Sequence, residues 1–485
     1  MLESYSILSE GQKIKIKITD DCKYVVEFME FPIATLTVIS QLKNKIISNL
    51  KFIPSQITSF EKRRELKEGI KNRAEIVIKE EFKGVDKETE EYIICDMVRD
   101  MIGLGKIDIL LSDDQLEEIN IVSSLEPVRV YHKKYGWMPT NILMKSEDEI
   151  KEVATKIARR VGKEISNLSP LLDAHLITGD RVNAILSPIT PKGNSITIRK
   201  FAKEPWTVVH FIKSNTCSIE LFALIWMAMQ YESSILVSGG TGSGKTSMLN
   251  VMMPFIPPNH RIVSIEDTRE LQLQEFLYWE PTVTREPNPE GKGGVKDYDL
   301  MINSLRMRPD RIILGEIRKK ETAEVFFEAL HTGHSVYGTV HANNSEETIE
   351  RLTHPPISIS PILLRGIDLN IVMFRDRKKN IRRVAQVAEF IKRTTADNQI
   401  TISDNPLYQW DGIKDKIVKV NPSQRFMEQL RLTTGMSQKD IEKDLAEKQK
   451  ILLYMVKKDM TNIIEVGKIM KAYYTDMASL KKLIK

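Results

Sequence analysis

The stretch Ser238–Ser247, SGGTGSGKTS, lies near the middle of the 485-residue chain and concentrates four of its 23 glycines within six positions. Glycine serves where a backbone adopts positive φ or approaches another group closely. From Gly239 to Thr246 the spacing matches G-x-x-x-x-G-K-[ST], the phosphate-binding P-loop. The apolar run SSILVS before it predicts a buried strand, and KTSMLNVMM after it predicts a helix. This strand–loop–helix arrangement predicts a nucleotide-binding α/β domain.

Each residue type of the loop has a chemical role toward a nucleoside triphosphate. Backbone N–H groups and the helix N-terminus supply positive dipole ends for phosphate oxygens. Lys245 would reach the β- and γ-phosphates, and Thr246 would hold Mg²⁺ through its hydroxyl. We therefore expect ATP and Mg²⁺ as cofactors. The predicted nucleotide-binding residues are Gly239, Gly240, Thr241, Gly242, Ser243, Gly244, Lys245, Thr246 and Ser247.

Length and composition predict a soluble protein of two to four domains, because 485 residues exceed a single core. The net charge of +5 comes from 71 basic and 66 acidic side chains, a mild excess that favours neither nucleic acid nor membrane as a partner. Cys22, Cys95 and Cys217 lie far apart, which is typical of a reducing cytosol and excludes a four-cysteine zinc site. The longest apolar run, Leu221–Met229, is too short to cross a bilayer, so any membrane contact is expected to be peripheral.

Changes of pattern along the chain predict five segments. Residues 1–85 form an N-terminal extension with a hairpin and charged helices, and residues 86–202 form a mixed α/β domain. A linker, residues 203–217, leads into an ATPase core at 218–400. There the apolar strands RIVSIE, RIILGE and SVYGTVH alternate with amphipathic helices, which predicts a doubly wound sheet. Strands and then helices follow over residues 401–485.

Two carboxylates follow predicted strands of this core. Glu266 ends the apolar strand of RIVSIEDTREL, and Glu316 follows the strand of RPDRIILGEIRKKE. The carboxyl ends of parallel strands meet at one edge of a sheet, where ligands bind. Gly315 stands where such a strand usually offers an Asp to the metal. Either glutamate could position the attacking water or complete the Mg²⁺ shell, and the sequence leaves open which one does.

Three of the eight histidines fall in the segment HTGHSVYGTVHA. His334 and His341 flank its predicted strand. We expect one of them to sense the γ-phosphate from a strand end next to the P-loop. A zinc site is the weaker interpretation, because no cysteine is near.

Two pairs of arginines are further candidates for the site. Arg306 and Arg308 precede the Glu316 strand, while Arg181 and Arg199 lie in the preceding domain, within TGDRVNAI and SITIRKF. A guanidinium that stabilises transition-state charge can come from another domain or subunit. Without a binding partner, all four would be ordinary surface charges.

The segments GGTGSGKT, VSIEDTREL, RPDRIILGEIR and TGHSVYGTVHA, in this order, resemble the Walker A, Asp box, Walker B and His box of the type II/IV secretion ATPase superfamily. The Gly315–Glu316 form of Walker B is that family's own. The resemblance covers about residues 90 to 395. It is strongest toward the archaeal branch, whose members include pilus-assembly and archaellum motor ATPases.

That resemblance implies an N-terminal mixed α/β domain hinged to a RecA-like doubly wound ATPase domain, with a helical C-terminal region. It implies a homo-hexamer in which Arg181 and Arg199 reach the nucleotide, and Arg306 and Arg308 lie near the catalytic boxes. The implied activity is ATP hydrolysis coupled to mechanical work. The motor would be cytoplasmic, at the inner face of the cytoplasmic membrane, with peripheral membrane contact. Its partner would be a polytopic membrane platform protein of a pilus-like machine.

Three alternatives stay open at this point. An archaellum assembly or rotation motor would share every motif. A RecA-like nucleic-acid translocase would need a basic, aromatic loop, whereas residues 285–299 are Gly-rich, mixed in charge and predicted to be a mobile loop, so no nucleic acid is expected. A P-loop scaffold that binds without hydrolysing is disfavoured by Glu266 and Glu316. Extension, retraction and rotation are equally compatible with the sequence.

Overall fold

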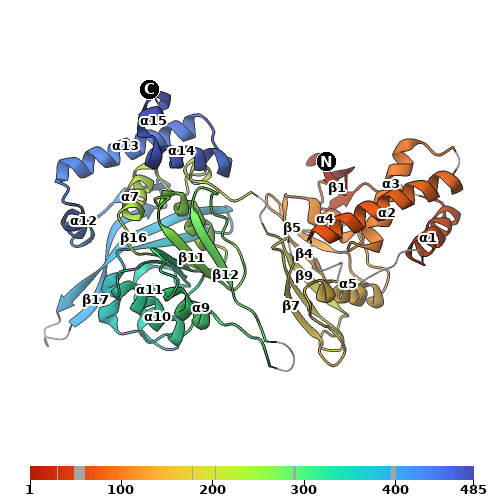
Figure 1. Ribbon diagram of the computed structural model, residues 1–485, viewed down its shortest axis with the longest axis horizontal. Coiled ribbons are helices and arrows are strands. Elements are labelled where there is room, and N and C mark those ends of the chain that lie inside the picture. The colour runs from red at the N-terminus through yellow and green to blue at the C-terminus, as the bar shows by residue number, and fades with distance from the viewer. Residues whose placement is uncertain are drawn as a thin grey trace. The chain divides into compact units, whose positions relative to one another are not determined.

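The computed structural model describes residues 1–29, 31–48, 60–82, 84–176, 178–201, 204–287, 291–394 and 400–484. The chain divides into two compact units, Met1–Lys203 and Glu204–Lys485, which Figure 1 shows in the red-to-yellow and the yellow-to-blue parts of the colour scale. Among the described helices, none is long and apolar enough to cross a bilayer.

The first unit begins with a small antiparallel sheet of β1 (Glu3–Ser9), β2 (Gln12–Ile18) and β3 (Tyr24–Val26). In β2 lysine and isoleucine alternate, and the isoleucines are buried, as one strand of the expected hairpin requires. β1 is an addition that the sequence did not predict. The hydroxyls of Tyr5 and Tyr24 both donate to Asp113 Oδ2, at 2.7 and 2.6 Å. These bonds connect the small sheet to the α/β part of the same unit.

A second, six-stranded antiparallel sheet in the order β6-β5-β4-β9-β8-β7 forms the centre of this unit. Its strands are β4 (Leu116–Ile121), β5 (Arg129–His132), β6 (Gly136–Pro139), β7 (Leu171–His175), β8 (Arg181–Ile185) and β9 (Ser195–Arg199). The helices α4 (Ile107–Ser112) and α5 (Glu147–Arg160) pack on it, and the side chain of Ser146 caps α5. Ile14 and Ile16 of β2 share one apolar core with Ile119 and Ile198 of this sheet. The first strands of the predicted extension are therefore part of the α/β core.

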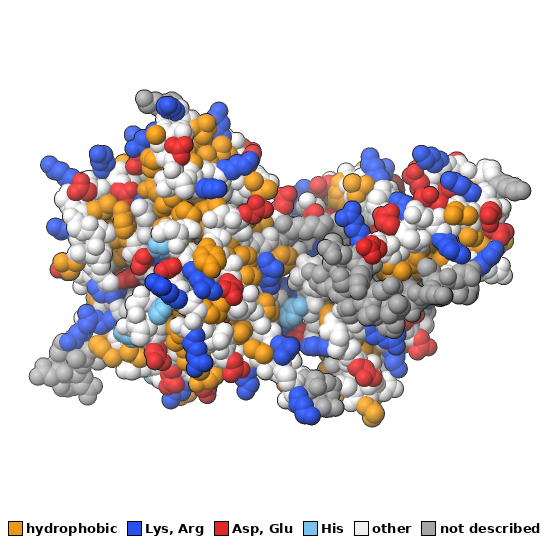
Figure 2. Space-filling view, viewed as in Figure 1, with side chains coloured by type: hydrophobic (Ala, Val, Ile, Leu, Met, Phe, Trp, Pro, Cys, Tyr) orange, Lys and Arg blue, Asp and Glu red, His pale blue; other side chains and the backbone are white. Residues whose placement is uncertain are grey.

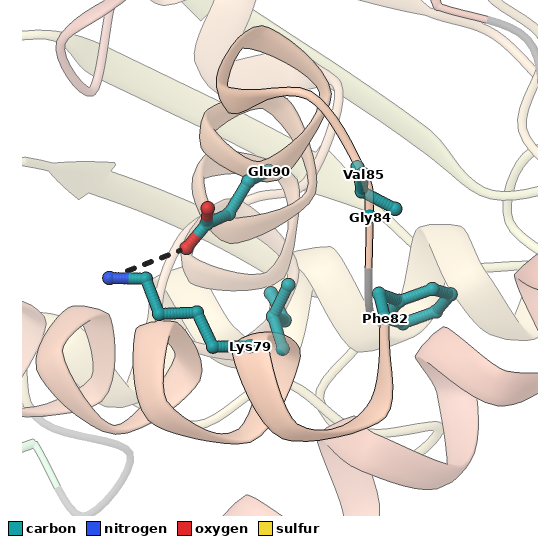
Figure 3. A pocket seen from close by; sticks show the side chains of 6 residues that line it. Lys79, Phe82, Gly84, Val85 and Glu90 are labelled. Carbon is teal, nitrogen blue, oxygen red and sulfur yellow. Dashed lines mark ion pairs between the residues drawn. The ribbon is translucent and has the colours of Figure 1, made fainter.

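Three helices form a separate apolar cluster in the first unit: α1 (Ile33–Ser48), α2 (Phe60–Glu81) and α3 (Lys87–Met101). A pocket of about 150 Å³ lies between the end of α2 and the start of α3. Lys79 and Glu90 form an ion pair of 3.8 Å at this pocket, as Figure 3 shows. The pocket belongs to the first unit, whereas the P-loop lies in the second.

The second unit is built on a nine-stranded sheet in the order β12-β11-β13-β14-β10-β15-β16-β17-β18. The strands from β12 to β15 are parallel, and β16 to β18 continue the sheet in antiparallel fashion. Their bounds are β10 (Ile235–Gly239), β11 (Arg261–Glu266), β12 (Tyr278–Val283), β13 (Arg311–Leu314), β14 (Ser335–Val340), β15 (Leu369–Asp376), β16 (Ile381–Thr394), β17 (Ile400–Asp411) and β18 (Lys416–Lys419).

Alternate residues of β10 face two different cores, which is the mark of a doubly wound sheet. Ile235 and Val237 belong to one core, with α7 (Ile219–Gln230) and α8 (Lys245–Met252). Leu236 belongs to the other, on the face covered by α9 (Asp297–Leu305), α10 (Lys320–His331) and α11 (Ser345–Thr353). Two short 3₁₀ turns complete the layers, η2 (Met253–Phe255) and η3 (Pro361–Gly366). The predicted fold class, with a RecA-like doubly wound domain after a mixed α/β domain, is confirmed.

Four helices end the chain and pack against the α7 side of the sheet: α12 (Phe426–Thr434), α13 (Gln438–Lys457), α14 (Ile463–Thr475) and α15 (Met477–Ile484). They lie together at the blue end of the chain in Figure 1. A capping box of Ser437 and Asp440 begins α13. The helical C-terminal region thus shares one apolar core with the nine-stranded sheet.

Three segments differ from their sequence-based description. Residues 203–217 include α6 (Val208–Lys213), whose Val208, Val209 and Phe211 are buried in the second unit, so this part is not an extended linker. β17 pairs with β16, so the expected boundary at 400/401 falls inside one sheet. Within the expected loop 285–299, residues 288–290 lie outside the described residues. On either side, Arg285 and Val295 exchange backbone hydrogen bonds of 2.8 and 2.7 Å.

Candidate nucleotide-hydrolysis site

The P-loop connects the buried strand β10 to α8, as predicted. Gly244 caps α8 in the left-handed region, with φ of 98°, where glycine is favoured. A Cβ on Gly239 would lie 2.4 Å from Ser243 Oγ and 2.6 Å from the carbonyl oxygen of Met373. The tight turn therefore needs glycine at both ends. The N–H groups of the first turn of α8, which have no partner within the helix, can bind an anion there.

Lys245 is folded over its own loop. Its Nζ donates to the carbonyl oxygens of Gly239, at 2.8 Å, and of Gly240, at 3.2 Å. Burial lowers the pKa of Lys245, while the nearby carboxylate of Glu316 opposes that shift. The ammonium is thus held at the loop, within the electrostatic reach of Glu316, where the β- and γ-phosphates would lie.

Glu266 ends β11 and is almost fully buried, with 3% of its surface exposed. Its Oε1 accepts the backbone N–H groups of Glu270, at 2.9 Å, and Leu271, at 3.0 Å. Its Oε2 is buried and has no hydrogen-bond partner among the described residues. Burial raises the pKa of Glu266 to about 7 despite the two N–H groups. This carboxyl is fixed in place with one oxygen free to accept a proton.

Glu316 and Asp267 are joined by Arg318, a residue that the sequence analysis did not select. The Arg318 guanidinium donates to Glu316 Oε2 through Nε at 2.9 Å and Nη2 at 2.5 Å. Its Nη1 donates to Asp267 Oδ2 at 2.9 Å. Asp267 follows β11 and Glu316 follows β13, so the arginine bridges the ends of two neighbouring strands. The signals in the sequence were its place two residues after Glu316 and its position at the end of the segment RPDRIILGEIR.

Of the two histidines, only His341 lies at the P-loop. Its Nε2 is 3.0 Å from Thr241 Oγ1. His334 precedes β14 and so lies at the amino ends of the parallel strands, whereas the P-loop lies at their carboxyl ends. The six residues of β14 separate the two ends by about 20 Å. There its Nδ1 lies 3.1 Å from the carbonyl oxygen of Ala329 at the end of α10. The expectation that His334 could sense the γ-phosphate of its own chain is wrong, because β14 runs parallel to β10.

Arg306 and Arg308 also lie away from the P-loop of their own chain. Both are exposed in the connection from α9 to β13, at the amino ends of the parallel strands. Glu316 and the P-loop lie at the carboxyl ends of the same sheet. Within one chain the two arginines therefore do not join the carboxylates.

Arg181 and Arg199 lie on the first unit, on the paired strands β8 and β9. Both are exposed. The guanidinium of Arg181 donates to Asp173 through Nε, at 3.3 Å, and Nη2, at 2.8 Å. This two-bond contact fixes the orientation of Arg181 on the sheet.

The residues at the loop fit a nucleotide with Mg²⁺. The glycine turn, the folded Lys245 and the unpartnered Oε2 of Glu266 together offer donors for phosphate and an acceptor for a proton. No group of three His, Cys, Asp or Glu side chains in the described part of the chain gathers closely enough to hold a metal by itself. Mg²⁺ would therefore depend on phosphate oxygens and the Thr246 hydroxyl, as it commonly does.

Comparison with known proteins agrees with these features. The family model described as type II/IV secretion system protein matches residues 128–372, half of the chain. A protein of Methanocaldococcus jannaschii is 35% identical over 401 residues, covering 80% of this chain and 71% of the relative. The type IV secretion system protein PtlH of Bordetella pertussis is 32% identical over 293 residues, covering 52% of this chain and 84% of PtlH.

Among solved structures, the ATPase DotB of Legionella pneumophila is 19% identical, with 76% of this chain and 94% of DotB covered and a TM-score of 0.41. The family match spans strands of both units and contains the P-loop, Glu266, Glu316 and His341. From that match and the 35% identity to the Methanocaldococcus protein, the chain belongs to the type II/IV secretion system protein family.

Proposed function

We propose that this chain is the ATP-hydrolysing motor of a membrane-associated filament-assembly or secretion machine, and that it works as a ring of six copies. One observation carries the proposal: in a member of this family, Lys245 lies folded over a P-loop whose sheet edge also bears Glu266 and Glu316. These are the parts that phosphoryl transfer to water requires, namely a phosphate cradle, a cation and a positioned carboxylate.

The residues divide the work between binding and proton transfer. The loop N–H groups and Lys245 bind the phosphates, and Thr246 with phosphate oxygens would hold Mg²⁺, which polarises the γ-phosphate. Glu266 is the better proton acceptor, because its Oε2 is unpartnered in the described residues and its pKa of about 7 lies near the working pH. Glu316, bound by Arg318, orients the water or supports the metal shell.

The ring accounts for the arginines that one ATPase domain does not use. Arg181 and Arg199 are exposed on the first unit, and Arg306 and Arg308 are exposed at the sheet edge away from their own P-loop. A head-to-tail interface that closes after six copies would bring such residues to a nucleotide held by another domain or chain. Closure of the first unit over the nucleotide would then couple hydrolysis to rigid-body motion.

The proposed partner is a polytopic membrane platform protein, reached from the cytoplasm with peripheral membrane contact. The name of PtlH, a type IV secretion system protein, supports secretion or filament assembly as the use of the motor. The relative from Methanocaldococcus jannaschii supports only the archaeal branch of the family. Within that branch we propose a pilus-like machine, with an archaellum motor as the alternative. Figure 2 shows basic and acidic side chains interspersed over the face drawn, and a net charge of +5 adds no strong steering toward nucleic acid.

Phosphate release tests the proposal when it is measured with three additions: buffer alone, anionic lipid vesicles and single-stranded DNA. We expect Mg²⁺-dependent ATP hydrolysis that lipid stimulates and DNA does not. Sedimentation at several protein concentrations with a non-hydrolysable ATP analogue should give a six-copy species. Stimulation by DNA alone would favour a nucleic-acid motor, and binding of ATP without hydrolysis would favour a scaffold.

A further inference from the structure

Two arginines that lie far from the P-loop in the sequence contact it in space. Arg375 on β15 and Arg382 on β16 are opposite each other in the antiparallel register of these strands. β15 is also the parallel neighbour of β10, the strand that leads into the P-loop. The pair therefore lies at the end of the strands that flank the loop.

The contacts with the loop are specific. Arg382 Nε donates to the carbonyl oxygen of Gly242 at 3.2 Å. Arg375 Nη1 lies 2.8 Å from the position that a Cβ on Gly242 would take, and Arg382 Cδ lies 3.5 Å from the corresponding position on Gly244. Arg375 thus packs against Gly242, and Arg382 packs against both Gly242 and Gly244.

The pair lies on the side of the loop opposite to the proposed chemistry. β10 lies between β14 and β15 in the sheet. His341, Glu316 and Glu266 follow β14 and the strands beyond it, whereas the arginines are on the β15 side. A group in this position can act on the loop itself without reaching the reacting phosphate from the catalytic side.

The strand that bears Arg382 is itself anchored. The next residue, Arg383, donates to Asp415 through Nε and Nη2, each at 2.7 Å. Its Nη1 donates to the carbonyl oxygen of Ser214, at 3.0 Å, just after α6. Arg382 therefore contacts the loop from a strand whose position these hydrogen bonds fix.

We propose that Arg375 and Arg382 are positioning residues that hold the P-loop in its phosphate-binding form and so set nucleotide affinity without entering the hydrolysis step. This inference rests on the proposed nucleotide-binding function of the loop. A glycine-rich loop has many conformations available, and a ligand's apparent affinity falls in proportion to the fraction of the loop that is competent to bind. A charge-assisted bond to Gly242 raises that fraction before any nucleotide arrives.

The test combines binding, kinetics and hydrogen exchange in the full-length chain. We expect Arg382→Ala to raise the Kd for MgADP and for a non-hydrolysable ATP analogue by the same factor, about tenfold. The KM for ATP should rise equally and kcat should stay within about twofold. Arg375→Ala should act in the same direction, and the double variant should lose less than the two single losses combined. Arg377→Ala, an exposed arginine of the same hairpin turn, is the control and should change none of these values.

Amide hydrogen exchange without nucleotide separates this role from direct contact with the ligand. Exchange across residues 239–246 should be faster in Arg382→Ala than in wild type or Arg377→Ala. An unchanged Kd, a fall in kcat at unchanged Kd, or unaltered exchange would each overturn the inference. Failure of this inference can be told apart from failure of the proposed function. A wild-type chain that binds no nucleotide refutes the proposed function, whereas unaltered hydrogen exchange refutes the positioning role of Arg375 and Arg382.

Discussion

Arg181 and Arg199 lie directly opposite each other on the neighbouring antiparallel strands β8 and β9. Directly opposed residues of such a pair point to the same face of the sheet, so the first unit presents two guanidinium groups side by side. Arg181 is oriented by Asp173, and Glu118 on β4 is opposite Arg199 in the register. The two arginines lie on the exposed face of these strands, and each has a carboxylate beside it.

The first prediction concerns this pair. If it closes over the γ-phosphate, Arg181→Ala or Arg199→Ala should reduce turnover by about 10³, the value that a transition-state arginine can have. Binding of MgADP should change little, because ADP lacks the γ-phosphate. Arg129→Ala, an exposed arginine on β5, is the matched control. Normal turnover in both variants would remove the first unit from the active site.

The second prediction concerns Arg318, which bridges Glu316 and Asp267. Loss of the bridge in Arg318→Ala should lower kcat by about 10², because a displaced catalytic group loses its alignment with the reacting atoms. ATP-analogue binding should be nearly retained, and Arg318→Lys should recover part of kcat through one remaining bond. Lys320→Ala removes only an exposed ion pair to Glu324, at 3.7 Å, and should behave as wild type. An unchanged or increased kcat in Arg318→Ala would contradict the bridging role.

The third prediction follows from the raised pKa of Glu266. The carboxyl has a pKa of about 7 in the folded chain against 4.5 for the free group. Between these pH values it ionises in the unfolded chain but stays protonated in the folded chain, which lowers the free energy of unfolding. The stability present below about pH 4.5 is lost as pH rises toward and through 7, by about 3 kcal/mol in total. Glu266→Gln lacks this penalty and should be more stable than wild type at pH 8 but not at pH 4.5.

Denaturant unfolding of both chains at the two pH values measures this difference. Glu275→Gln, at an exposed position nearby, should show no such pH-dependent gain. Equal stability of Glu266→Gln and wild type at pH 8 would mean that the buried carboxyl titrates normally.

The fourth prediction concerns Lys448 on α13, a fully buried lysine that attaches the C-terminal helices to the core. Its Nζ lies 2.5 Å from Asp444 and 2.9 Å from the hydroxyl of Tyr473, and it stands over the ring of Trp226 at 5.5 Å. Lys448→Ala removes the ion-pair partner of the mostly buried Asp444 and leaves a cavity beside Trp226, so it should lower the free energy of unfolding by about 3 kcal/mol. Lys450→Ala, at an exposed position two residues later, should cost less than about 0.5 kcal/mol. A small loss at both positions would show that the helices do not depend on this contact.

The parts of the fold that follow from local pattern were predictable from the sequence. β10 and α8 carry a short apolar run, a glycine turn and a helix start in direct succession, and each of these signals depends on neighbours in the chain. The N-caps Ser146 and Ser437 are local signals of the same kind, because each accepts a backbone N–H from three residues later in the chain.

The sequence did not predict contacts between segments that lie far apart along the chain. Asp113 accepts hydrogen bonds from the hydroxyls of Tyr5 and Tyr24, which lie about 90 to 110 residues earlier in the chain, and no local sequence pattern predicts these contacts. Arg382 reaches Gly242 across 140 residues. The distance of His334 and Arg308 from the P-loop of their own chain was unpredictable for a different reason. They stand beside catalytic segments in the sequence, but parallel strands put them at the edge of the sheet away from the P-loop.

In the proposed function, the P-loop binds ATP for hydrolysis and Glu266 is the proton acceptor. Phosphate release, measured beside analogue binding for wild type, Lys245→Ala, Glu266→Gln and Glu316→Gln, tests it most directly. We predict Mg²⁺-dependent release by wild type, none by Lys245→Ala with weakened binding, and at least about 100-fold slower release by Glu266→Gln with binding retained. Hydrolysis by Lys245→Ala at the wild-type rate, or normal turnover by Glu266→Gln beside a slow Glu316→Gln, would contradict the account.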